Sequence, residues 1–212
     1  VMNAAIRQCG LWLRAGIEVN VSLNISARDL LNPDLPASFI EMLQRHGCES
    51  RLITLEITES AVLDDPLRAL ANLQALRDTG CMLSIDDYGT GYSSLSYLKQ
   101  MPVSEMKIDR SFVMNLVENP NDEIIVRSTI ELAHNMGLKV TAEGVETEAV
   151  LERLRELGCD LAQGYLISKP IPVEALEKWF RESHWALISV AEPGTCADND
   201  EAVAEPEHAD AL

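Results

Sequence analysis

Four carboxylates and one lysine stand at or near the ends of short β-like runs in this sequence. The carboxylates are Glu56, Asp86, Asp87 and Glu143, and the lysine is Lys107. Carboxylates held together without a cation repel one another, and some of them would stay protonated at neutral pH. Hard oxygen ligands such as these suit Mg²⁺ or Mn²⁺. The residue types therefore predict a site for a hard divalent cation.

The adjacent pair Asp86-Asp87 could give one ligand to each of two metal ions, or could bridge them. Two ions about 3.5–4 Å apart clamp the attacking and leaving oxygens of an in-line displacement, as in phosphodiester hydrolysis. Lys107 could hold a phosphate oxygen or the attacking water. It could also form an internal salt bridge that neutralises the carboxylates, and the two roles are compatible.

A glycine-rich stretch follows the aspartate pair directly, in the order Gly89-Thr90-Gly91-Tyr92-Ser93-Ser94. Next to the aspartates it suggests a mobile lid or coupling loop, with an ordinary turn as the alternative. Glu59 comes soon after Glu56, beyond the expected strand end. We expect Glu59 to anchor this loop, and plain surface charge is the alternative.

Strand-like runs alternate with helical patterns along the chain, which predicts parallel strands joined by right-handed helical crossovers. The expected strands are Val19–Ser26, Leu52–Thr58, Met82–Asp86, Glu105–Asp109, Lys139–Glu143 and Leu161–Tyr165. The expected helices are one near Ala5–Leu13, then Leu35–His46, Pro66–Thr79, Asp122–Met136, Thr147–Leu157 and Pro172–Glu182. Several of these helices are followed by a glycine, the usual residue just past a helix end.

Each expected strand alternates apolar and polar residues, so that each polar set lies on one face. The apolar face must meet the helices. One polar residue per strand then converges at the strand ends: Asn24, Glu56, Asp86, Lys107, Glu143 and Gln163. A closed barrel points such residues inward at its mouth. An antiparallel sheet with one solvated face is the alternative, which the intervening helices oppose.

The composition excludes several classes of partner. A formal net charge of -17 argues against binding to DNA, RNA or an anionic membrane surface. No apolar run reaches the roughly 18 residues of a membrane-spanning helix. Five scattered cysteines without a CxxC motif indicate reduced thiols in the cytoplasm. Acidic residues without lysine or arginine near the end predict a disordered tail at 189–212, after a domain at 1–188.

Six motifs, in order, resemble the EAL-domain family of cyclic di-GMP phosphodiesterases. They are Asn24-Ile25-Ser26, Glu56-Ile57-Thr58-Glu59, Asp86-Asp87-Tyr88-Gly89-Thr90-Gly91, Lys107-Ile108-Asp109, Ala142-Glu143-Gly144-Val145-Glu146 and Gln163-Gly164-Tyr165. The resemblance extends from the start of the chain to about Trp179. It implies a (β/α)₈ TIM-like barrel that hydrolyses cyclic di-GMP to linear pGpG with two Mg²⁺ or Mn²⁺ ions.

The resemblance also implies a role for each matching residue. The metal ligands would be Asn24, Glu56, Asp86, Asp87 and Glu143. The catalytic group would be Lys107, which positions or activates the water, with Glu143, Gln163 and Glu59. Supporting residues would be Glu146, Asp109, Gly89, Thr90 and Gly91. Tyr88 stands where the family usually has Phe, and the aromatic ring is kept. We also expect a homodimer through the Asp86–Ser94 region.

The Glu-Ala-Leu motif that names the family lies upstream of its Asn motif, on the second barrel strand. This chain begins after that point. We therefore expect the first two strands, one Glu ligand and nearby substrate contacts to belong to a longer bacterial protein. Because six strands cannot close the barrel, we expect the chain alone to be unstable or partner-dependent and at best weakly active. Its open edge would invite aggregation.

Three functions are compatible with these observations. The first is hydrolysis of cyclic di-GMP, the second is a catalytically inactive receptor for it, and the third is a regulatory or dimerisation module. Inactive members of such a family would be expected to have lost ligands. Every ligand position that the chain contains is intact, which favours the enzyme.

Overall fold

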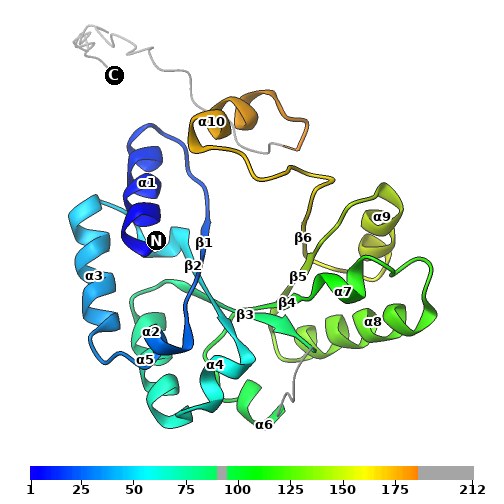
Figure 1. Ribbon diagram of the computed structural model, residues 1–212, viewed down its shortest axis with the longest axis horizontal. Helices are drawn as coiled ribbons and strands as arrows, with labels where there is room; N and C mark the ends of the chain where they lie inside the picture. The colour runs from blue at the N-terminus through cyan, green and yellow to red at the C-terminus, as the bar shows by residue number, and fades with distance from the viewer. Residues whose placement is uncertain (90–94, 186–212) are drawn as a thin grey trace, which may run out of the picture.

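The computed structural model describes residues 1–89 and 95–185 of the chain. Its six strands are all parallel and run in the order β1-β2-β3-β4-β5-β6. They are β1 (Val21–Asn24), β2 (Ile53–Thr58), β3 (Met82–Tyr88), β4 (Glu105–Ile108), β5 (Lys139–Glu143) and β6 (Leu161–Gln163). The sheet forms a half-barrel that is open between β1 and β6 (Figure 1). The predicted barrel-type α/β architecture is thus confirmed for the described residues.

Helices connect and follow the strands, and most of them cover the outer face of this half-barrel in two groups. They are α1 (Met2–Arg14), α2 (Ala27–Leu30), α3 (Leu35–His46), η1 (Ser50–Leu52), α4 (Glu59–Leu63), α5 (Pro66–Asp78), α6 (Leu95–Leu98), α7 (Arg110–Val113), α8 (Pro120–Asn135), α9 (Glu148–Glu156) and α10 (Val173–Glu182). In Figure 1, α1, α3 and α5 lie beside the first strands, and α8 and α9 lie beside the last ones. Each helix predicted from the sequence is present, with ends that differ by a few residues.

Local sequence signals set several of these ends. Asp65 caps α5 by accepting a hydrogen bond from the Arg68 amide at 3.3 Å. The predicted inclusion of Asp109 in the fourth strand was wrong, since β4 ends at Ile108. Asp109 instead caps α7, because its carboxylate accepts the Ser111 amide at 3.0 Å. A capping side chain competes with continued strand pairing, which ends the strand there.

The apolar strand residues face the helices and form two buried clusters. In the first, Leu55 of β2 is buried with Phe39 of α3 and Leu73 of α5. In the second, Val140 of β5 is buried with Ile130 of α8. Burial of apolar area is the main stabilising contribution in such a layer. The opposite, inward face is therefore left for the polar half of each strand.

A bulge interrupts β3 at the aspartate pair. Ile85 is paired with Met106, and Tyr88 is paired with Ile108, so Asp86 and Asp87 together oppose Lys107. Asp87 has a φ of 54°, the one positive value among non-glycine residues of the described chain. Aspartate tolerates this left-handed conformation better than most residues. An extra residue in one strand bends the ladder and re-aims its side chains.

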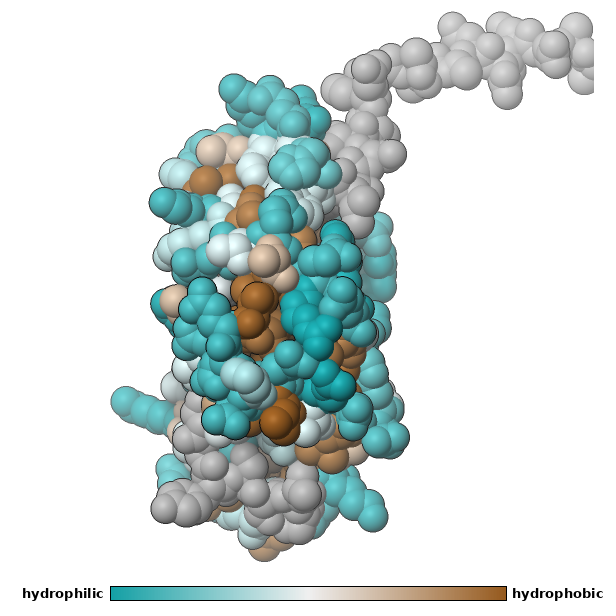
Figure 2. Space-filling model, turned by 90° about the vertical axis from the view of Figure 1, so that its right-hand side faces the viewer, coloured by the Kyte–Doolittle hydropathy of each residue, from teal (hydrophilic) through white to brown (hydrophobic). Residues whose placement is uncertain are grey.

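The surface over α8 and α9 is mostly hydrophilic, with small apolar islands (Figure 2). Ile124 of α8 is one of the exposed apolar side chains, with 61% of its surface accessible. In the part of the chain that the structure describes, no helix is long and apolar enough to cross a membrane. The acidic tail predicted at 189–212 lies outside the described residues.

Candidate metal centre at the strand ends

Lys107 is the centre of an ion-pair group that joins four strands. Its Nζ lies 3.0 Å from Glu56 Oε1, 3.1 Å from Asp86 Oδ1 and 2.5 Å from Glu143 Oε1. Lys107 comes from β4, and the three carboxylates come from β2, β3 and β5. Lys107 is 3% exposed and Glu56 is 7% exposed. The sequence pattern predicted this convergence, and the structure brings these four side chains into contact.

The charges in this group alter its acid–base behaviour. Burial alone would lower the pKa of Lys107, but its hydrogen bond to Glu143 and its interactions with Glu56 raise that pKa overall. An ammonium held in this way donates hydrogen bonds and does not accept a proton. Burial also raises the pKa of Glu143, although Lys107 opposes the rise. Burial and the neighbouring Asp86 and Asp109 raise the pKa of Asp87.

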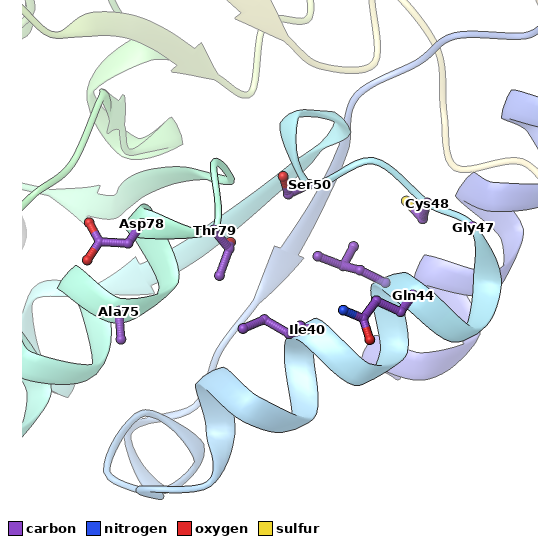
Figure 3. Close-up of a pocket in the computed structure, with 9 residues that line it drawn as sticks. Ile40, Gln44, Gly47, Cys48, Ser50, Ala75, Asp78 and Thr79 are labelled. Atoms are coloured by element: carbon purple, nitrogen blue, oxygen red, sulfur yellow. The ribbon is translucent and has the colours of Figure 1, made fainter.

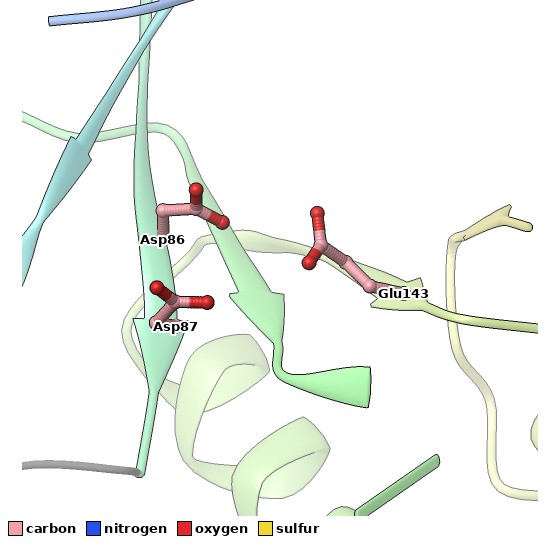
Figure 4. A group of neighbouring side chains, drawn as sticks. All are labelled: Asp86, Asp87 and Glu143. Carbon is pink, nitrogen blue, oxygen red and sulfur yellow. The ribbon is translucent and has the colours of Figure 1, made fainter. Parts of the chain in front are cut away.

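Asp86, Asp87 and Glu143 form the part of this group that could hold a metal. Each offers one carboxylate oxygen, and these oxygens lie within 4.8 Å of one another. Figure 4 shows Asp86 and Asp87 leaving β3 on the same side, toward Glu143 of β5. Strict alternation would send Asp87 to the opposite face, so the bulge is what makes the trio possible.

The donor set fits a hard divalent cation. All three ligand oxygens belong to carboxylates, which suit Mg²⁺ or Mn²⁺. Asp86 Oδ1 is buried and accepts no aligned hydrogen bond from the described residues, despite its charge contact with Lys107. A bound cation would give this buried oxygen a directed contact in addition to the charge of Lys107. The residues present therefore fit the ion that the sequence analysis predicted.

Two further predicted residues lie beside this group rather than inside it. Asn24 is the register partner of Glu56, and Gln163 is the register partner of Glu143. Both side chains are exposed. Asn24 lines a cavity of about 660 Å³ with Ser26 and Thr58. Gln163 lines another, of about 360 Å³. Asn24 and Gln163 thus lie on the two edge strands of the sheet, next to the strands that carry Glu56 and Glu143.

The residues predicted to support the loop are only partly brought together. Glu59 Oε1 accepts the Gly89 amide at 3.5 Å, a long hydrogen bond. Asp109 lies beside Asp87, and its carboxylate contributes to the raised pKa of Asp87. Glu146 is exposed, and no ion pair among the described residues includes it. Thr90 and Gly91 lie outside the described residues.

Two residues near the site were assigned no role of their own from the sequence. Ser84 lies two residues before Asp86 and is fully buried, and its hydroxyl has no hydrogen-bond partner among the described residues. Gly164 lies where a Cβ atom would come within 2.1 Å of the Val145 carbonyl oxygen. The glycine of the Gln163-Gly164 pair is a usable signal, because a close backbone approach is a common reason for glycine. Nothing in the sequence indicates that the Ser84 hydroxyl would be buried without a hydrogen-bond partner.

A groove of about 550 Å³ opens elsewhere, between α3 and α5 (Figure 3). Its lining is mainly apolar, with Ile40, Leu43 and Ala75. Asp78 is the one carboxylate among its lining residues. It contains none of the residues that could bind a metal in the described chain. The chemistry is therefore concentrated at the strand ends and not in this groove.

Comparison with known proteins agrees with this geometry. The EAL domain matches residues 1–170 of the chain. A bifunctional diguanylate cyclase/cyclic di-GMP phosphodiesterase, MucR of Pseudomonas aeruginosa, is 44% identical over 177 residues, covering 83% of this chain and 26% of MucR. The cyclic di-GMP phosphodiesterase NbdA of the same organism is 40% identical over 182 residues, covering 85% of this chain and 23% of NbdA. The chain thus spans about a quarter of the length of these relatives.

Solved structures share the fold. The Pseudomonas MucR phosphodiesterase in complex with c-di-GMP has a TM-score of 0.78 at 43% identity, over 82% of this chain and 71% of that one. The EAL domain of Mycobacterium smegmatis DcpA has a TM-score of 0.80 at 39% identity, over 84% of this chain and 80% of that one. Together with the matched motifs, these likenesses show that the chain belongs to the EAL domain family.

Proposed function

We propose that the protein to which this chain belongs hydrolyses cyclic di-GMP to linear pGpG in the cytoplasm, with two Mg²⁺ or Mn²⁺ ions. The observation that carries the proposal is the trio of Asp86, Asp87 and Glu143 gathered around Lys107 at the strand ends. The relatives MucR and NbdA are named as cyclic di-GMP phosphodiesterases, which supports the substrate.

The residues divide the work in this proposal. Bound metal ions would hold phosphate oxygens and lower the pKa of a water molecule. Asp86, Asp87 and Glu143 would hold the ions, with Asn24 and Glu56 as further ligands. Lys107 would donate hydrogen bonds to a phosphate oxygen or to the attacking water, as suits an ammonium with a raised pKa. Gln163 and Glu59 would position the water and the loop.

The direct test follows cyclic di-GMP and pGpG in the presence of Mn²⁺. We expect turnover by the intact protein, and its loss on Glu143→Gln or Asp86→Asn, which keep the side-chain shape and remove a charge. Glu41→Gln is the matched control, because Glu41 is an exposed residue in an i,i+4 ion pair with Arg45 on α3. The control should retain full turnover.

The other outcomes separate the competing functions. Binding of cyclic di-GMP without turnover would support an inactive receptor. Neither binding nor turnover would leave a regulatory or dimerisation module. We propose a homodimer through the Asp86–Ser94 region, of which residues 90–94 lie outside the described residues. Sedimentation of the intact protein tests that contact independently of the chemistry.

A further inference from the structure

Lys107 already supplies positive charge where the proposed metal would act. Its Nζ lies within about 3 Å of oxygens from Glu56, Asp86 and Glu143. No other lysine or arginine of the described chain forms an ion pair with these carboxylates. Lys107 is 3% exposed, so little solvent screens these contacts. One ammonium therefore pairs with carboxylates from three strands and offsets only part of their negative charge.

The contacts of Lys107 are not equal. Its interactions with Glu143 and Glu56 are hydrogen bonds. Its contact with Asp86 Oδ1 at 3.1 Å is a charge contact, and that oxygen has no aligned hydrogen bond within the described residues. Asp86 and Glu143 are also two of the three residues whose oxygens could hold a cation. The lysine and a metal would thus share both of these carboxylates, and Glu56 as a third when it serves as the further ligand proposed above.

We propose that Lys107 is a built-in counter-ion that holds this carboxylate group together before metal binds, and that it competes with the metal for Asp86 and Glu143. The inference rests on the metal dependence in the proposed function. Like charges a few ångströms apart repel strongly at low dielectric. Lys107 therefore has to loosen its contact with at least one shared carboxylate as the cation enters.

The counter-ion role of Lys107 can be distinguished from a purely structural role by the effect of removing the lysine. A residue that only stabilises the fold would, when lost, weaken the protein with and without metal. A competing counter-ion would, when lost, weaken the metal-free protein but strengthen metal binding. The difference arises because the unpaired carboxylates repel one another until a cation arrives. Metal affinity and metal-free stability must therefore move in opposite directions.

The experiment measures binding of Mn²⁺ alone by isothermal titration calorimetry, together with melting in EDTA and in excess Mn²⁺. Lys107→Met removes the charge and keeps a long flexible side chain. We expect its Kd for Mn²⁺ to fall by about tenfold or more. We also expect a lower Tm in EDTA and a larger rise in Tm on adding Mn²⁺, as linkage requires. No nucleotide is needed for either readout.

Two variants serve as controls. Lys107→Arg keeps the charge and should bind Mn²⁺ with nearly the wild-type Kd. Arg51→Met removes one positive charge from the exposed ion pairs with Glu18 and Glu49, and it should leave the Kd unchanged. An unchanged or weaker Kd for Lys107→Met would overturn the proposal. A Lys107→Met protein that stays unfolded even in saturating Mn²⁺ would overturn it as well, since a divalent cation could not then replace the lysine.

The same data keep the two proposals apart. If the wild-type protein binds no Mn²⁺, the metal-dependent function itself fails. If the wild-type protein binds Mn²⁺ and hydrolyses cyclic di-GMP while Lys107→Met binds no more tightly, only the counter-ion role fails.

Discussion

The backbone conformation of Asp87 is what brings it into the candidate metal site with Asp86 and Glu143. Its φ of 54° belongs to the bulge that turns two consecutive aspartates to the same side of β3. Such a conformation costs a non-glycine residue free energy, and it persists only where the surroundings impose it. Burial and the nearby charges of Asp86 and Asp109 also disfavour the ionised form of Asp87, and they raise its pKa. Strain and charge repulsion thus coincide at a predicted ligand.

Replacing Asp87 by Asn should separate these effects. Asn tolerates the left-handed conformation and lacks the charge. We expect the Tm in EDTA to stay the same or rise, because a repulsive charge is removed. We expect the Kd for Mn²⁺ to weaken by about 10- to 100-fold, the loss typical of a disturbed metal site. Calorimetry and melting measure both quantities, and unchanged Mn²⁺ affinity would remove Asp87 from the ligand set.

Ser84 offers a second test at this scale. Its buried hydroxyl has no partner among the described residues, so Ser84→Ala should raise the free energy of unfolding by about 1 kcal/mol. Thr141→Val is the matched control, because the Thr141 hydroxyl donates to Glu105 at 2.7 Å and its loss should destabilise. Urea titrations compare the two variants. A destabilised Ser84→Ala would mean that the hydroxyl has a hydrogen-bond partner in solution.

At the scale of the elements, Asp160 joins three parts of the fold. It stands just before β6, accepts the Val140 amide of β5 at 2.8 Å, and pairs with His134 of α8 at 2.9 Å. Burial would raise the pKa of Asp160, but the interactions with His134 and Val140 lower it overall. The carboxylate therefore stabilises the folded state in its ionised form.

The lowered pKa of Asp160 determines how its contribution to the free energy of unfolding depends on pH. A lowered pKa contributes stability above the pKa of the unfolded chain, about 3.9, and the contribution is lost as the pH falls through the folded value. At pH 7, Asp160→Asn should therefore lower the free energy of unfolding by about 1 kcal/mol. The difference from wild type should shrink below about pH 4. Urea unfolding from pH 3 to pH 8 measures it, and a difference independent of pH would contradict the account.

Much of this arrangement could be predicted from the sequence. Alternation along the strands placed Glu56, Asp86, Lys107 and Glu143 on one face, and the structure brings them into contact. Alternation could not predict Asp87, because a bulge breaks the period of two. Alternation also could not predict which carboxylate oxygens lie nearest to Lys107, because those distances depend on the stagger between neighbouring strands. The alternation of residues along a strand predicts which face a side chain lies on, whereas the register between strands determines which side-chain atoms come into contact.

For the whole molecule, the open sheet is the dominant feature. The described strands end at β1 on one side and β6 on the other, and neither outer edge is paired. Unpaired edges present backbone groups that can bind another strand. The Ile25 amide donates to Glu56 of β2, so by alternation the Ser22 amide faces the open side of β1.

We therefore expect the 212-residue chain to associate as its concentration rises, through these edges. Sedimentation velocity over a concentration series measures this. Ser22→Pro should reduce association, because it removes a free-edge donor without breaking the pairing of β1 with β2. A chain that stays monomeric and melts in one cooperative step would contradict this expectation.

The inward wall of the half-barrel has a thermodynamic consequence of its own. Thr54, Ser84 and Thr141 continue the polar lining below the charged group, and all three are buried. The inner wall of the half-barrel is therefore made of hydroxyls and ions more than of hydrocarbon, and these three side chains are already covered within the described residues. Heat capacity changes mainly with the apolar area that leaves water. A strand that docks at either open edge should accordingly remove little further water from these three side chains, so the change in heat capacity on docking should come from the groups at the edges.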